Sequence, residues 1–210
     1  MNHCLLCHSE STALFFEGNS HLFYKCSNCG TVFRDPDTFI SVEDEKARYL
    51  THNNDVEDER YQQFVSPITA SVLKDFTSKA TGLDFGAGTG PVITKVLKDN
   101  GYHIELYDPF FHPDNTVLER TYDFIVCCEV IEHFHNPLEE FKLLKRLLNP
   151  GGKLYCMSDI LVSIQEFDKW YYKDDPTHVI FYSEENLQWI RKASGFSNVF
   201  IDNRLIIFPV

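Results

Sequence analysis

The sequence predicts an α/β fold in which a mostly parallel sheet is covered by helices on both faces. From residue 81 on, short apolar runs of strand type alternate with amphipathic segments of helical period. A glycine-rich turn follows the first of these runs. The last two runs are joined by a short Asp-Asn turn, which indicates a C-terminal antiparallel hairpin. This alternation is typical of doubly wound, Rossmann-like sheets.

The composition limits the function classes. Hydrophobic residues make up 43% of the 210 residues, with 18 Phe and 10 Tyr, which is enough for a sizeable core. No apolar run approaches the roughly 18 residues that a membrane-spanning helix needs, and the first residues lack the pattern of a secretory signal. We therefore expect a cytoplasmic protein. The formal net charge of −12 disfavours nucleic acid as a partner, because no basic stripe is visible in the first 60 residues.

Two CxxC pairs distinguish residues 1–40. Their spacing is C-x2-C-x18-C-x2-C, and each pair places two thiolates on one tight turn. Four thiolates complete a tetrahedral Zn²⁺ site without an open position, which is typical of a structural site. The metal would stabilise a segment too short to bury much apolar surface. We expect residues 1–40 to form a small zinc ribbon with the ligands Cys4, Cys7, Cys26 and Cys29. The alternative is two reducible thiol pairs.

Residues 41–80 are charged and helical, and we expect them to form a helical linker or lid. Apolar residues recur at helical spacing from Tyr61 to Phe76, and Pro67 between them predicts a kink, or a break between two shorter helices. A polar and aromatic set is unusual for a plain linker and could fold over a ligand: Tyr49, His52, Asn53, Asn54 and Tyr61. The alternative is a solvated helix whose tyrosines face the core.

Residues 81–210 supply the alternating elements of the main domain. The apolar runs predict strands at residues 82–86, 102–108, 122–130 and 153–158, and a closing hairpin at 198–201 and 204–210. The amphipathic segments predict helices at residues 91–101, 137–152 and 183–195. Ser183 is the expected N-cap of the last helix.

The stretch LDFGAGTG, Leu83–Gly90, lies between the first strand and the first helix of this domain. Three glycines remove Cβ atoms where the chain reverses, so that a ligand can approach the backbone. The spacing G-x-G-x-G differs from the dinucleotide fingerprint G-x-G-x-x-G and disfavours a nicotinamide dehydrogenase. Asp108 ends the second strand 18 residues after Gly90, where its carboxylate can accept hydrogen bonds from both hydroxyls of a ribose. The pattern favours a nucleoside ligand with free hydroxyls.

The segment from residue 81 to about 200 resembles the class I S-adenosylmethionine (SAM)-dependent methyltransferases, particularly the quinone- and sugar-type members. The matching stretches occur in the family's order: LDFGAGTG, GYHIELYDPF, YDFIVCCEVIEHFHNP, LLKRLLNPGGKLYC and DDPTHVIFYSEENLQWIRKASGF. The resemblance implies a SAM-dependent methyltransferase with SAM as its cofactor. With the zinc ribbon expected at residues 1–40, the chain also resembles zinc-ribbon methyltransferases, some of which act on ribosomal RNA and others on sugars attached to nucleotides.

The resemblance also implies the residues that bind the cofactor. The glycines would line its methionine and ribose, Asp84 would reach the methionine amino group through water, and Asp108 would hold the ribose. Because successive strand residues point to opposite sides, we expect only one of Cys127 and Cys128 to face the ligand. The implied cofactor-binding residues are Asp84, Phe85, Gly86, Ala87, Gly88, Gly90, Asp108, Pro109, Cys128 and Glu129.

One interval departs from the family pattern. Only 14 residues separate Asp108 from Asp123, which leaves room for at most one short strand, at 116–119, and for no full helix. The adenine pocket must then be built differently. Pro109, Phe110 and Phe111 could stack on the base or cover the edge of a shortened sheet.

Methyl transfer from a sulfonium is an in-line displacement, so the protein mainly orients the acceptor and excludes water. A general base is needed only where the acceptor loses a proton. The candidates are Glu132, His133, His135 and His178, and His133 is the preferred catalytic residue. A packing role for His133 and a loop-fastening role for His178 are the alternatives.

The acidic first 60 residues favour a small-molecule acceptor. An RNA methyltransferase is an alternative that would need a basic face. A non-catalytic module that binds SAM or S-adenosylhomocysteine (SAH) is another alternative, which the shortened segment after Asp108 keeps open.

Overall fold

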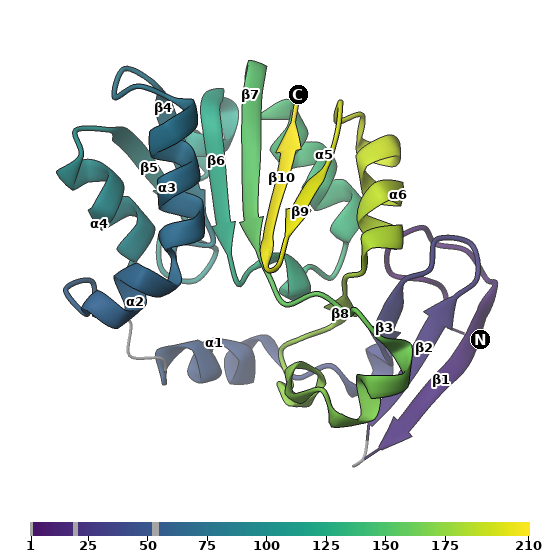
Figure 1. The fold of residues 1–210 in the computed structure, drawn as a ribbon. Helices are drawn as coiled ribbons and strands as arrows, with labels where there is room; N and C mark the ends of the chain where they lie inside the picture. The colour runs from purple at the N-terminus through teal and green to yellow at the C-terminus, as the bar shows by residue number, and fades with distance from the viewer. Residues whose placement is uncertain (1, 19–20, 52–54) are drawn as a thin grey trace.

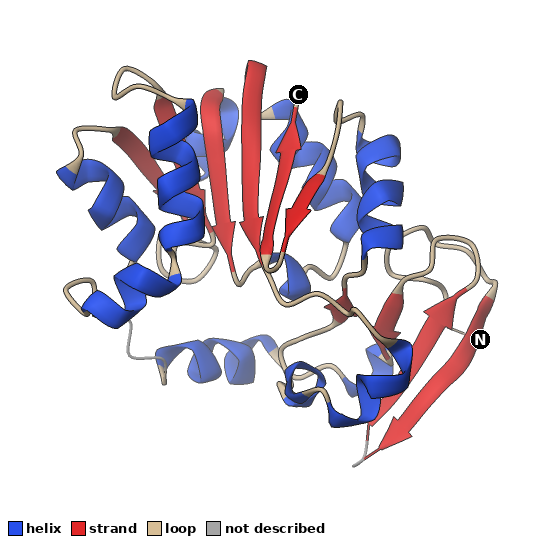
Figure 2. Ribbon diagram, viewed as in Figure 1, coloured by secondary structure: helices blue, strands red, loops and turns tan. Residues whose placement is uncertain are grey.

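The computed structural model describes residues 2–18, 21–51 and 55–210, and it contains a central sheet of six strands (Figures 1 and 2). The strands follow the order β5-β4-β6-β7-β10-β9. Strands β5, β4, β6 and β7 run parallel, whereas β10 pairs antiparallel with both β7 and β9. The predicted fold class is therefore confirmed. The strands are β4 Thr81–Phe85, β5 His103–Tyr107, β6 Tyr122–Cys128, β7 Leu148–Met157, β9 Phe200–Asp202 and β10 Leu205–Pro209.

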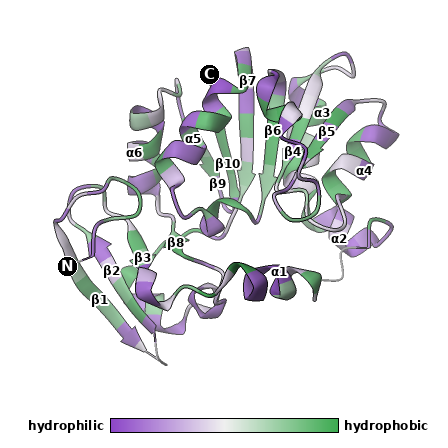
Figure 3. Ribbon diagram, turned by 180° about the vertical axis from the view of Figure 1, so that it is seen from behind, coloured by the Kyte–Doolittle hydropathy of each residue, from purple (hydrophilic) through white to green (hydrophobic). Residues whose placement is uncertain are grey.

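Helices cover both faces of the central sheet. In β6, Phe124 and Val126 pack with α3 and α4, whereas Ile125 and Cys127 pack with α5 and α6 on the opposite face. Figure 3 shows hydrophobic residues along these central strands. The helices are α1 Val42–Leu50, α2 Glu59–Phe64, α3 Ser66–Asp75, α4 Val92–Asp99, α5 Pro137–Arg146 and α6 Glu184–Ser194. None of these described helices has both the length and the apolar content that crossing a bilayer requires.

A second sheet holds the N-terminal segment. Its order is β1-β2-β3-β8, and every neighbouring pair is antiparallel. Strand β8 comes from the late part of the chain, so residues 1–40 share a sheet with the segment that follows the central strands (Figure 1). The sequence did not predict β8, because two residues are too few for an alternating pattern. The strands are β1 Thr12–Gly18, β2 His21–Cys26, β3 Val32–Arg34 and β8 Ile180–Phe181.

Several local predictions can be compared with the structure. The predicted break near Pro67 is confirmed, because α2 and α3 are separated at Val65. The predicted cap is confirmed as well, because Ser183 forms a capping box with Asn186. The helix predicted to reach residue 152 ends at Arg146, and the Pro-Gly-Gly stretch belongs to β7.

The short strand predicted at 116–119 is wrong, because Asn115–Glu119 is a 3-10 helix. Asp114 Oδ1 accepts a hydrogen bond from the backbone N–H of Thr116 at 2.9 Å, which starts a helical turn instead of a strand. The 3-10 helices are η1 Pro36–Thr38, η2 Asn115–Glu119, η3 Ile131–His133, η4 Ile164–Lys169 and η5 Tyr171–Asp174.

A buried arginine fastens the N-terminal sheet to the loop that precedes β8. Arg34, at the end of β3, is fully buried. Its Nε donates to the carbonyl oxygen of His178 at 3.0 Å, and its Nη2 donates to those of Lys173 and Asp175 at 2.7 and 2.8 Å. Its Nη1 is buried without a hydrogen-bond partner among the described residues, so these three bonds supply the compensation for burying the guanidinium. The N-terminal sheet thereby fixes the backbone of residues 173–178.

We expect Arg34→Lys to lower the free energy of unfolding by about 2–4 kcal/mol, because one ammonium cannot reach all three carbonyls and stays buried. Urea unfolding of the zinc-supplemented protein measures this loss. Arg60→Lys is the matched control, since Arg60 is exposed, and it should change stability by less than about 0.5 kcal/mol. Equal stability of the two variants would show that the buried guanidinium does not hold the loop.

Candidate functional site

A cavity of about 970 Å³ lies where the parallel strands β4, β5 and β6 end. Its wall includes residues 85–89 at the end of β4, 107–111 at the end of β5 and 128–130 at the end of β6. Helices α1 and α2, residues 133–135 and residues 171–178 form further parts of the wall. Figure 1 shows α1 running across the carboxyl ends of the strands. This is the edge at which open α/β sheets bind their ligands.

Most of the residues expected to bind a cofactor line this cavity, but two do not. Asp84 and Gly90 are not part of the wall. The Asp84 carboxylate is buried beneath α4 and accepts a hydrogen bond from the Thr94 hydroxyl at 2.7 Å. Those that line the cavity are Phe85, Gly86, Ala87, Gly88, Asp108, Pro109, Cys128 and Glu129.

The glycine-rich turn is held against β5. The backbone N–H groups of Gly86 and Ala87 donate to the carbonyl oxygen of Tyr107 at 2.8 and 3.1 Å. Gly86 has a φ of +81°, and a Cβ there would meet a methyl carbon of Val130 at 2.4 Å. Gly86 therefore serves the turn itself, in addition to leaving the backbone accessible from the cavity.

Asp108 connects this turn to the segment after β5. Its Oδ2 accepts a hydrogen bond from the Gly88 N–H at 2.9 Å, and its Oδ1 accepts from the N–H groups of Phe110 and Phe111 at 2.8 and 3.0 Å. A carboxylate has about four acceptor positions, so these three bonds leave capacity for a ligand hydroxyl. The side chain is mostly buried yet reaches the cavity.

Charged groups concentrate at the end of β6. Glu129 has a φ of +52°, an uncommon backbone conformation that is often found at functional sites. Its Oε2 accepts a hydrogen bond from Arg204 at 2.6 Å. Burial and the neighbouring Glu132 raise the pKa of Glu129 to about 8, although Arg204 opposes that rise. Arg204 lies in the β9–β10 turn. The sequence gives no reason to single it out from other residues of a hairpin.

Two histidines face each other beside these carboxylates, with ring centroids 4.9 Å apart. His133 Nδ1 lies 2.9 Å from the carbonyl oxygen of Thr177, and His178 Nδ1 lies 2.7 Å from that of Tyr172. Because a carbonyl oxygen only accepts, each ring carries its proton on Nδ1 and keeps a lone pair on Nε2. Burial lowers the pKa of both rings, that of His178 to about 3, so both are neutral near pH 7.

The remaining candidates occupy different surroundings. Cys127 is buried in the core whereas Cys128 lines the cavity, as strand alternation predicts.

Phe110 and Phe111 line the cavity, and Tyr49 of α1 packs against Phe110. Other wall residues that the sequence did not single out are Tyr107, Tyr172 and Asp175. Tyr49 and Tyr61 line the cavity, while His52, Asn53 and Asn54 lie outside the described residues.

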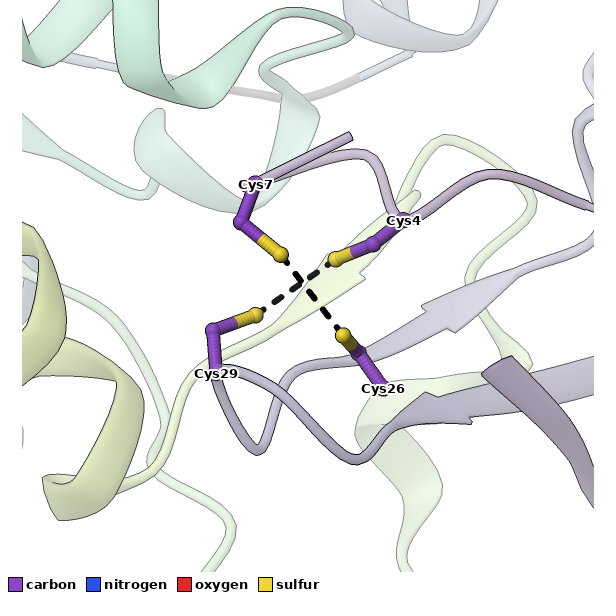
Figure 4. A group of neighbouring side chains, drawn as sticks. All are labelled: Cys4, Cys7, Cys26 and Cys29. Atoms are coloured by element: carbon purple, nitrogen blue, oxygen red, sulfur yellow. Dashed lines mark hydrogen bonds between the residues drawn. The ribbon is translucent and has the colours of Figure 1, made fainter. Parts of the chain in front are cut away.

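The four N-terminal cysteines converge on one point (Figure 4). The sulfur atoms of Cys4 and Cys29 are 3.5 Å apart, and those of Cys7 and Cys26 are 3.6 Å apart. Four sulfurs at about 2.3 Å from a tetrahedral zinc ion would be about 3.8 Å apart, which is close to these separations. The backbone N–H of Asn28 donates to Cys26 Sγ at 3.4 Å, which suits a thiolate. The cluster therefore fits a tetrahedral ion.

Comparison with known proteins gives a family match and several similar structures. Residues 57–200 match the model of a family described as a methyltransferase domain. A SAM-dependent methyltransferase from Archaeoglobus fulgidus superposes with a TM-score of 0.55 at 16% identity, over 71% of this chain and 94% of that one. The 1,6-didemethyltoxoflavin-N1-methyltransferase of Burkholderia thailandensis, with bound SAH, gives a TM-score of 0.53 at 16% identity, over 87% and 96%.

A candidate O-methyltransferase from Nostoc punctiforme gives a TM-score of 0.52 at 13% identity, over 71% of this chain. The chain spans 56% of the length of that protein. The search among curated proteins found no match. At these identities the solved structures show a shared fold.

Asp84 generates a prediction about stability and pH. Burial raises its pKa from 3.8 to about 6. The folded state therefore binds the proton more tightly than the unfolded state, and the resulting stabilisation is lost as the pH rises through about 6. Two pKa units correspond to about 3 kcal/mol. About a third of this loss is already complete at pH 4.5. We therefore expect wild type to lose about 2 kcal/mol more stability than Asp84→Asn between pH 4.5 and 7, as measured by urea unfolding.

Asp168→Asn is the control, because Asp168 is exposed. Its pH profile should follow wild type. Parallel profiles for wild type and Asp84→Asn would contradict a raised pKa at Asp84.

Proposed function

Because the chain belongs to the class I SAM-dependent methyltransferases, we propose that it transfers a methyl group from SAM to a small-molecule acceptor. The observation that carries this proposal is one continuous cavity of about 970 Å³, which runs from the glycine turn to His133 and His178. Ligand pockets usually measure about 300–1,000 Å³, so this volume suits a nucleoside cofactor together with a small acceptor.

We propose that the cofactor occupies the part of the cavity beside β4 and β5. Gly86 and Gly88 would contact its methionine and ribose. Asp108 would accept hydrogen bonds from the ribose hydroxyls with the capacity that its three backbone bonds leave. Phe110 and Phe111 would lie beside the adenine, and Cys128 and Glu129 would lie near the sulfonium.

The acceptor would bind between the sulfonium and residues 171–178. Methyl transfer requires an in-line approach and exclusion of water, and α1 together with residues 171–178 encloses this region. His133 is the proposed catalytic residue, because its Nε2 lone pair is held ready by the bond from Nδ1 to Thr177. It would take the proton of an acceptor hydroxyl or amine.

The charge of the cavity wall supports a small acceptor. Its basic residues are Arg48 and Arg204, and Arg204 is paired with Glu129. Its acidic residues are Glu45, Asp108, Glu129, Glu140, Asp174 and Asp175. A nucleic acid would meet repulsion there and from the formal net charge of −12.

We further propose that the division predicted from the sequence describes three working parts. Residues 1–40 would be a zinc ribbon, 41–80 a lid, and 81–210 the methyltransferase domain. The ion would stabilise the ribbon, and the ribbon would support residues 173–178 through Arg34.

Titration calorimetry with SAM and SAH tests the cofactor assignment. We expect wild type to bind both, and Asp108→Asn to bind them tenfold or more weakly, because a hydrogen bond to a charged group contributes about 1.5–3 kcal/mol. Asp114→Asn is the control, since Asp114 caps η2 on the surface. Failure of wild type to bind either compound would refute the proposed function, and full affinity of Asp108→Asn would refute the ribose assignment.

Transfer is then measured by incubating the protein with SAM labelled in its methyl group and a small-molecule extract. Mass spectrometry should detect labelled products that are absent without protein. Binding of SAH without any labelled product would favour the non-catalytic module.

The zinc proposal predicts that the four cysteines hold one zinc ion per chain, which elemental analysis measures as the zinc lost when a cysteine is replaced. Cys29→Ser should lose the ion and lower the melting temperature, because the ion stabilises the N-terminal sheet. Cys128→Ala should keep the ion, because Cys128 lies in the cavity wall. Zinc content unchanged by Cys29→Ser would contradict a four-cysteine site.

A further inference from the structure

A second group of metal-ligand residues lies at the acceptor end of the cavity. Glu132, His133 and His178 each offer one ligand atom, and these atoms lie within 4.8 Å of one another. Glu132 and His133 belong to η3, directly after β6, whereas His178 precedes β8. The backbone N–H of Val179 donates to the carbonyl oxygen of Glu132 at 3.0 Å, which fixes the two segments to each other.

Both imidazoles are oriented as metal ligands usually are. Each donates its Nδ1–H to a backbone carbonyl oxygen, of Thr177 and of Tyr172 respectively. Metal-bound histidines commonly donate their other ring N–H in this way, which fixes the tautomer and the ring plane. The Nε2 lone pairs are then the available ligand atoms. Both rings line the cavity, so an ion held by them would be accessible from it.

Glu132 provides the independent observation. Its side chain is fully buried. One carboxylate oxygen accepts a hydrogen bond from Tyr172, and the other, Oε2, is buried without a hydrogen-bond partner. A buried carboxylate oxygen without a partner is costly, and a cation would satisfy it.

We propose that Glu132, His133 and His178 bind a divalent first-row transition ion, such as Zn²⁺ or Co²⁺, at the acceptor end of the cavity. Two imidazole nitrogens and one carboxylate oxygen are a usual ligand set for these ions. Three protein ligands leave at least one position open, which is typical of catalytic sites. The cysteine cluster differs, because four thiolates close its coordination shell.

The surrounding charges favour a cation. Glu45, Glu129 and Asp175 act electrostatically on His133 as negative neighbours. Two arginines place positive charge nearby and so disfavour a cation. The charge of Arg34 lowers the pKa of His178, whereas the charge of Arg204 is compensated by its ion pair with Glu129.

If the chain transfers a methyl group to a small-molecule acceptor, as proposed above, the ion would also indicate that the acceptor group is a hydroxyl. Its open position would bind an acceptor hydroxyl and lower the pKa of that hydroxyl. The O–CH₃ bond would form as the S–CH₃ bond of SAM breaks, with SAH leaving and the hydroxyl proton passing to water. His133 would then hold the ion instead of taking the proton.

Cobalt binding tests the site without cofactor or acceptor. Protein that carries one zinc ion per chain, held by the cysteines, is titrated with Co²⁺ by equilibrium dialysis and visible absorption. We expect one Co²⁺ per chain with the d–d bands of nitrogen and oxygen ligands, and without the sulfur-to-cobalt charge transfer that thiolates give. His178→Ala and Glu132→Gln should weaken this binding tenfold or more.

His103→Ala is the matched control, because His103 is exposed on β5, and it should bind Co²⁺ like wild type. Thermal melting without cobalt checks that each variant is folded, and electron spin echo spectroscopy of wild type should detect two imidazole nitrogens without any substitution. The inference is overturned if wild type binds no Co²⁺, if the bound ion shows only thiolate ligation, or if folded His178→Ala binds it equally well. Since neither SAM nor acceptor is present, that outcome leaves the proposed methyl transfer untouched.

Discussion

The burial of the Arg34 guanidinium is the constraint on which the site depends. Its charge can stay inside the protein only because three carbonyl oxygens of residues 173–178 accept its hydrogen bonds. Those carbonyls fix the same backbone that presents His178 and, through the oxygen of Thr177, orients His133. The N-terminal sheet, remote from β6 in the sequence, thereby takes part in shaping the end of the cavity at His133 and His178.

The end of β6 places two carboxylates, Glu129 and Glu132, in a region where burial makes their negative charge unfavourable. Glu129 and Glu132 lie close together in a mostly buried region, and the negative charge of Glu132 raises the pKa of Glu129. Arg204 compensates Glu129 directly, at 2.6 Å, and also lowers the pKa of Glu132. One carboxylate oxygen of Glu132 accepts a hydrogen bond from the Tyr172 hydroxyl, whereas Oε2 is buried without a hydrogen-bond partner in the part of the chain that the structure describes. A proton or a cation on Glu132 relieves this imbalance, so the region is suited to binding positive charge from a ligand.

The sequence predicts what depends on local pattern, and it misses what depends on pairing between distant segments. The sequence places the glycine turn and Asp108 at one edge of the sheet, because strand, turn, helix and strand follow one another within residues 82–108, and in the structure both line the cavity. The sequence does not indicate strand β8 or single out Arg204, because a two-residue strand and one arginine in a hairpin turn carry no periodic signal. The resemblance implies that Asp84 reaches the cofactor through water, and in the structure its carboxylate is bonded to Thr94 beneath α4. Whether a carboxylate such as that of Asp84 is covered by a helix depends on tertiary packing. The spacing of residues along the sequence gives no information on this.

The shortened segment after β5 explains why Asp108 makes so many backbone bonds. Only the 3-10 helix η2 stands between β5 and β6, so no further strand supports the turn at residues 108–112. The Asp108 carboxylate supplies part of that support, by accepting from the N–H groups of Phe110 and Phe111 while also bonding Gly88. The same carboxylate is the proposed ribose ligand. Local folding and cofactor affinity should therefore be coupled at this residue, and a cofactor that bonds Asp108 would order the turn beside the adenine.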